Sequence, residues 1–115
     1  MPKKKNKKIW STVYADKQFS KAIIKRDKKC LRCSKINQLT CSHYWTRYYS
    51  AARYNYRNCI TLCIGCHFKW EEEKQGEYRD FMLQYLGQEE FDKLRMETHK
   101  TVKRKDAIKQ LMLNL

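Results

Sequence analysis

Apolar residues recur at helical spacing near both ends of the chain. Phe19, Ala22 and Ile23 stand at i, i+3 and i+4, and they predict a short amphipathic helix over about 17–28. In the C-terminal part, the same spacing predicts three more helices, within residues 78–86, 91–98 and 108–115. Gly87 is suited to end the first of these. Such apolar stripes are typical of packing faces rather than of a cofactor site.

The middle of the chain has the composition of β-strands. Residues 39–45 are rich in β-formers and predict a short strand that ends near His43, and a second strand is expected around 59–62. Residues 46–57 lack a clean period and are expected to form a loop, with or without one turn of helix, whereas a helix should run over about 64–74. This order of strand, loop, strand and helix, flanked by further helices, predicts a small α+β fold.

The length of 115 residues favours one domain, over 9–115, with a helical C-terminal part from about residue 76. Residues 1–8 contain five lysines and are expected to be a flexible basic tail. No apolar run approaches the ~18 residues of a membrane-spanning helix, and the N-terminus lacks the apolar stretch of a signal peptide. We therefore expect a cytoplasmic protein with no membrane partner.

Four of the six cysteines form two C-x-x-C pairs, Cys30 with Cys33 and Cys63 with Cys66. Two such turns can supply the four thiolates of a tetrahedral zinc site, and a zinc ion with four protein ligands is structural. Three disulfides are the alternative for a secreted protein, but a reducing cytoplasm favours zinc. The two remaining cysteines, expected to be small buried residues beside the site, are Cys41 and Cys59.

Three polar residues around the second pair, His43, Asn58 and His67, form an H…N…H constellation. Phosphodiester hydrolysis requires a base that activates water and a metal ion that neutralises developing charge. His43 suits the base, and His67 with Glu71 one helical turn later could hold Mg²⁺ or Mn²⁺. Asn58 could hydrogen-bond across the loop and orient His43. Taken singly, His43 could be a core histidine, His67 a further zinc ligand and Glu71 part of a solvated acidic face.

The net charge of +14 lies entirely in the first 70 residues, which hold 17 Lys and Arg against two acids. This asymmetry favours a polyanionic partner, and nucleic acid above all, over a role in solubility alone. The loop after His43 interleaves arginines, which bind phosphate, with aromatic rings, which stack on unpaired bases. The residues expected to contact DNA are Arg47, Arg53, Arg57, Tyr48 and Tyr49.

With these residues in view, the chain resembles the His-Me (HNH) endonucleases, and more narrowly the NinG (Rap) family of phage recombination endonucleases. The similarity covers roughly residues 17–112, through the segments RDKKCLRC, SHYWTR, ARYN, NCITLCIGCH and GEYRDFMLQYLGQEEFDKL. The resemblance implies a ββα-metal fold and cleavage of branched DNA, such as Holliday junctions or flaps, in the host cytoplasm if the gene is phage-borne. It implies that His43 is the general base, Asn58 the central asparagine and His67 a metal ligand.

One position departs from the broad HNH pattern, in which Asp or His often precedes the base as a second metal ligand. This chain has Ser42 there, a poor ligand for a divalent cation, so Glu71 or water would complete the metal sphere. A non-catalytic, zinc-containing DNA-binding accessory or regulatory protein is the main alternative, and an RNA-binding zinc protein is a weaker one. Cleavage of both strands of a junction would suit a homodimer.

Overall fold

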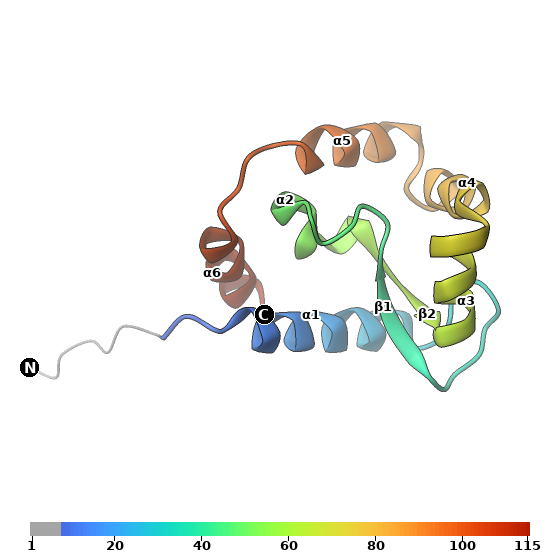
Figure 1. The fold of residues 1–115 in the computed structure, drawn as a ribbon, viewed down its shortest axis with the longest axis horizontal. Helices are drawn as coiled ribbons and strands as arrows, with labels where there is room; N and C mark the ends of the chain where they lie inside the picture. Colours follow the sequence, from blue (N-terminus) through green and yellow to red (C-terminus); the bar gives the residue numbers. More distant parts are fainter. Residues whose placement is uncertain (1–7) are drawn as a thin grey trace, which may run out of the picture.

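A two-stranded antiparallel sheet lies at the centre of the protein, with helices around it (Figure 1). The computed structural model describes residues 8–115, so the predicted basic tail lies, apart from Lys8, outside the described residues. Strand β1 (Leu39–His43) pairs with strand β2 (Cys59–Cys63) in a register that places Leu39 opposite Cys63 and His43 opposite Cys59. Both predicted strands are confirmed, and β1 ends at His43.

Helix α1 (Thr12–Asp27) packs against the sheet and begins about five residues before the predicted start. Ser11 explains that start, because its side chain accepts a hydrogen bond from the Tyr14 N–H at 3.1 Å and caps the helix. The buried face of α1 consists of Ala15, Phe19 and Ile23, which recur at every fourth position.

The connection between the strands contains one turn of helix, α2 (Ser50–Arg53), and the 3₁₀ turn η1 (Tyr56–Asn58). After β2, the chain enters helix α3 (Ile64–Phe68) without a loop. The predicted helix over 64–74 is confirmed, but its second half is the π-helical turn η2 (Lys69–Glu73), in which the Lys74 N–H donates to the Lys69 carbonyl at 2.7 Å.

The three predicted C-terminal helices are confirmed as α4 (Gln75–Leu86), α5 (Gln88–Thr98) and α6 (Arg104–Asn114). They run in an arc past the sheet, and the arc brings the C-terminus beside the start of α1 (Figure 1). Gly87 separates α4 from α5 with a φ of 83°, a conformation that favours glycine. Among the described residues, no helix is both long and apolar enough to span a bilayer.

Two apolar clusters hold these elements together. One joins cysteines of the two C-x-x-C pairs and strand β2 to α4, and it contains Ile60, Leu62, Trp70 and Met82. The other joins α1 to α6 and contains Phe19, Ile23, Cys41, Cys59, Ile108 and Leu111. The predicted burial of Cys41 and Cys59 is therefore confirmed, with exposed fractions of 7% and 0%. Ile60 and Leu62 project into the first cluster, whereas Cys59 and Cys41 project from the opposite face of the sheet into the second.

Candidate metal centre and active site

The two C-x-x-C pairs meet beside the sheet. Cys30 and Cys33 follow α1, Cys63 ends β2 and Cys66 lies in α3, and their four ligand atoms all lie within 4.8 Å of one another. The sulfurs of Cys33 and Cys63 are 3.7 Å apart. A tetrahedral zinc site with Zn–S bonds of about 2.3 Å requires sulfurs about 3.8 Å apart. These cysteines could therefore hold a metal ion such as zinc.

The surroundings act differently on different cysteines of the cluster: burial raises the pKa of Cys66 to about 12 despite the nearby Arg32, whereas Cys30 is shifted the other way. Burial by itself would raise the pKa of Cys30, but backbone N–H groups that point at its sulfur lower the pKa to about 7. The Arg32 guanidinium donates to the Cys66 sulfur at 3.4 Å and to Glu77 at 3.0 Å, and it lies over the Trp70 ring. Arg32 thus supplies a positive charge beside the sulfurs and ties them to α4.

Asn58 closes the loop that follows β1. The residue is completely buried, and its Oδ1 accepts a hydrogen bond from the Trp45 N–H at 2.8 Å. Its Nδ2 donates to the carbonyls of Trp45 at 2.8 Å and Ala52 at 3.1 Å. The Tyr44 N–H in turn donates to the Asn58 carbonyl at 2.9 Å. Asn58 therefore fixes the backbone directly after His43, in line with the predicted bond across the loop.

His43, the last residue of β1, is buried and oriented. Its Nε2–H donates to the Arg53 carbonyl at 2.8 Å, since a carbonyl can only accept. The lone pair of the neutral ring is therefore on Nδ1. Burial lowers the pKa of His43 to about 4, so the ring is neutral at pH 7. The ring is oriented and has a free lone pair that can accept a proton, but the burial that lowers its pKa also makes it a weak base at neutral pH.

His67 and Glu71 form a close pair one helical turn apart. The Thr40 hydroxyl donates to the Leu62 carbonyl, so its contact of 2.7 Å with His67 Nδ1 has the ring as donor. The His67 Nε2 lies 2.7 Å from Glu71 Oε1, so a ring that carries both protons forms an ion pair with the carboxylate. Imidazole nitrogen and carboxylate oxygen are also ligand types for divalent cations, and the Mg²⁺ or Mn²⁺ site at this pair stays a prediction.

A cleft of about 470 Å³ lies between the end of β1, the π-helical turn and α4, and both His43 and Glu71 line it. The structure thus brings the predicted base and the tentative metal ligand to one cleft, while His67 adjoins it through Glu71. The rings of His43 and His67 belong to different surroundings: His43 packs 6.0 Å from Phe19 of α1, whereas His67 bonds Thr40. Ser42 is buried, and its hydroxyl bonds the Tyr78 hydroxyl at 2.8 Å.

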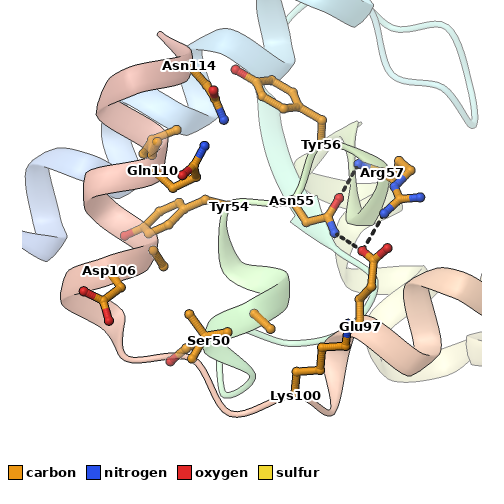
Figure 2. A pocket seen from close by; sticks show the side chains of 14 residues that line it. Ser50, Tyr54, Asn55, Tyr56, Arg57, Glu97, Lys100, Asp106, Gln110 and Asn114 are labelled. Carbon is orange, nitrogen blue, oxygen red and sulfur yellow. Dashed lines mark hydrogen bonds and ion pairs between the residues drawn. The ribbon is translucent and has the colours of Figure 1, made fainter.

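Two of the arginines predicted to contact DNA are engaged inside the protein. Arg53 is only 8% exposed, and its guanidinium donates twice to Asp16, at 2.9 and 2.6 Å. Arg57 lines a hollow beside α5 and α6 and pairs with Glu90 and Glu97, as Figure 2 shows for Glu97. The prediction of phosphate contacts is therefore not supported for either arginine, because acidic residues distant in sequence neutralise both.

Of the three other residues predicted to contact DNA, Arg47 and Tyr48 are exposed and Tyr49 is half-buried. Tyr48 is 84% exposed, and the Arg47 side chain is 51% exposed, although one of its nitrogens lies 3.7 Å from Asp16. Tyr49 is half-buried against Trp45 and His99, with ring centroids 5.9 and 5.3 Å apart. Tyr48 and Arg47 are thus placed where an extended polyanion could reach them.

A basic stripe that the sequence reasoning did not identify runs along α1. Lys17, Lys21 and Lys25 are all exposed and follow one another at every fourth residue, so they share one face of the helix. Within residues 8–115, none of the three forms an ion pair. Their spacing could have shown the stripe, because the helix itself was predicted.

Comparisons of the chain with protein-family models, with curated proteins and with solved structures gave no match.

Proposed function

We propose that the protein is a metal-dependent DNA endonuclease of the HNH type, and that it hydrolyses phosphodiester bonds in branched recombination intermediates. The observation that carries the proposal is the cleft shared by His43 and Glu71. Both residues line this cleft, and the Glu71 carboxylate is bonded to a second histidine, His67. A general base and a cation site beside one cleft are what phosphodiester hydrolysis requires.

His43 is the base in this proposal. Its Nδ1 removes a proton from a water molecule as the water oxygen attacks the phosphorus, and the Arg53 carbonyl holds the resulting imidazolium in place through Nε2–H. Asn58 is a positioning residue, because its bonds to Trp45 and Ala52 fix the loop that carries the Arg53 carbonyl.

Glu71 and His67 are the residues that would hold Mg²⁺ or Mn²⁺. When bound, the ion supplies positive charge for the leaving 3′ oxygen and the charged phosphorus centre. Ser42 does not contribute, because its hydroxyl is bonded to Tyr78. Two protein ligands with water at the other positions are sufficient for Mg²⁺, which keeps several of its waters.

The positive charge of the α1 lysines and the exposed ring of Tyr48 support the proposal of a branched DNA substrate. The unpaired lysines of α1 would contact the phosphate backbone without reading sequence. Tyr48, 84% exposed beside Arg47, would stack on a base that is left unpaired at a branch point.

The test uses a labelled four-way junction and a matched linear duplex, each incubated with the purified full chain in Mg²⁺, in Mn²⁺ and in EDTA. Nicking of the junction that requires the metal and is abolished in His43→Ala supports the proposal, provided that DNA binding and the zinc of the four-cysteine site stay unchanged. Retained nicking in His43→Ala contradicts it.

Glu71→Gln, with Glu72→Gln as its matched control, tests the cation site. Glu72 is the exposed neighbour in the same turn, so its loss changes the charge equally. We expect Glu71→Gln to raise the Mg²⁺ concentration at half-maximal rate by about 10-fold or more, whereas Glu72→Gln leaves it within about 2-fold. Equal effects of the two variants argue against Glu71 as a ligand.

A second candidate is a non-catalytic, zinc-containing DNA-binding accessory of recombination. The observation that favours it is the burial of His43, 9% exposed, together with the engagement of Ser42 by Tyr78. This candidate predicts binding of the junction without nicking under every metal condition.

A further inference from the structure

We propose that Cys41, His43 and Cys59 form a second metal site, selective for a thiophilic ion such as Zn²⁺. One ligand atom from each residue lies within 4.8 Å of the others, and all three side chains are buried. The site is separate from the four-cysteine centre, since none of the three residues belongs to that group.

The register of the sheet explains why the three residues converge. His43 stands directly opposite Cys59, and Cys41 precedes His43 by two residues, so all three side chains project from the same face of the sheet. That face is covered by α1, where the Phe19 ring lies 6.0 Å from the His43 ring.

The histidine is arranged as metal-binding histidines commonly are. Its Nε2–H donates to the Arg53 carbonyl at 2.8 Å, which fixes the ring and leaves the lone pair of Nδ1 for a metal. Two thiolates and one imidazole are ligands that select Zn²⁺ or Cu⁺ over Mg²⁺ or Ca²⁺. Two thiolates also neutralise Zn²⁺, so a buried complex would carry no net charge.

The second metal site and the proposed nuclease activity would both use the same atom, Nδ1 of His43. If Nδ1 of His43 is the base, then a thiophilic ion at this site occupies the lone pair that must accept the proton from water. Such an ion would bind tightly and inhibit cleavage, whereas Mg²⁺ at His67 and Glu71 would support it. The existence of the metal site does not depend on the nuclease activity, and its test counts metal ions.

The experiment measures zinc per chain by elemental analysis, after the full-length protein is saturated with Zn²⁺ and desalted. It is done in a His67→Ala background, which removes the other candidate cation site. We expect about two zinc ions per chain in this parent and about one after Cys41→Ala or Cys59→Ala. Ser42→Ala is the matched control, because Ser42 is a buried neighbour that bonds Tyr78 and should leave the count at two.

A count of one in the parent overturns the proposal, and so does a count of two that survives both cysteine substitutions. Titration of the unsubstituted chain with Co²⁺ covers the case in which a cysteine variant does not fold. The second equivalent should then add thiolate-to-cobalt absorption to that of the first. A second equivalent that adds none overturns the inference, whether or not the protein cleaves DNA.

Discussion

The side-chain amide of Asn58 forms two hydrogen bonds with the backbone of Trp45. The Trp45 N–H donates to Asn58 Oδ1, and Asn58 Nδ2 donates to the Trp45 carbonyl, each at 2.8 Å. Such a pair reproduces with one side chain the reciprocal bonding of two paired strands. It extends the pairing of β1 and β2 just beyond His43, at the place where the backbone strands separate.

Asn58→Ala should lower the free energy of unfolding by about 2–4 kcal/mol, because it leaves buried backbone groups of Trp45 and Ala52 without partners. Urea denaturation followed by circular dichroism measures this change. Asn55→Ala is the control, since Asn55 is only partly buried and caps the short turn η1. A loss for Asn58→Ala no larger than that for Asn55→Ala would show that the loop closes without the amide.

Removal of one thiolate should release the metal and destabilise the fold. Cys33 is the best position, because it is the exposed member of the four-cysteine group and its substitution disturbs no packing. For Cys33→Ser we expect loss of about one zinc ion and of roughly 3 kcal/mol or more of stability. Zinc analysis and thermal unfolding check both, with Ser34→Ala as control. Unchanged stability with the zinc lost would mean that the metal does not hold α1 to the hairpin.

The ion pair between Asp16 and Arg53 should make stability depend on pH. Burial would raise the pKa of Asp16, but hydrogen bonds from Arg53 and Tyr54 outweigh it and lower the pKa below the ordinary 3.8. The stabilisation is therefore fully present above about pH 4 and is lost as the pH falls through the lowered pKa.

Asp16→Asn should accordingly cost about 1–2 kcal/mol at pH 7, and the difference from the parent should shrink below pH 4. Urea denaturation at several pH values from 3 to 7 measures it. Asp106→Asn, at an exposed carboxylate that forms no ion pair within residues 8–115, is the control for the change of charge. A difference that stays constant down to pH 3 contradicts the assignment.

The lysine stripe of α1 should carry much of the affinity for DNA. Replacing Lys17, Lys21 and Lys25 by alanine should weaken binding of the junction by about 10-fold or more at 0.1 M salt. The slope of log K against log salt should fall by about 2–3, because each lost phosphate contact contributes about 0.9.

Fluorescence anisotropy over a range of salt concentrations measures both quantities. The control replaces Lys100, Lys103 and Lys105, which are exposed near the start of α6 and give the same change in net charge. If the two triple variants lose affinity equally, then overall charge rather than the α1 face governs binding.

The local elements could be predicted from the sequence, since each depends on a short-range pattern. Phe19 and Ile23 mark the face of α1, and the β-forming residues before His43 mark β1. The π-helical turn could not be predicted, because its i to i+5 bond from Lys74 to Lys69 has no signature in residue preference.

The candidate site was predictable only in part, for a similar reason. The four thiolates and the pair of His67 with Glu71 follow from spacings within one turn. Arg57, in contrast, meets its acidic partners 33 and 40 residues further along the chain, and only the packing of α5 decides that meeting. The contact of His43 with Cys59 likewise depends on strand register, which the Asn58 bonds help to set.

The loop between β1 and β2 is closed by the hydrogen bonds of Asn58, and this closure bears on which sequence changes the protein can tolerate. Since the side-chain amide seals the loop through backbone atoms of Trp45 and Ala52, residues 46–51 contribute no side chain to the seal. Insertions or exchanges in that segment, where Tyr48 is exposed, would leave the hairpin and the cysteines in place. The exposed surface of this loop and the contacts that close it therefore depend on different residues, so the surface can vary in sequence while the fold is kept.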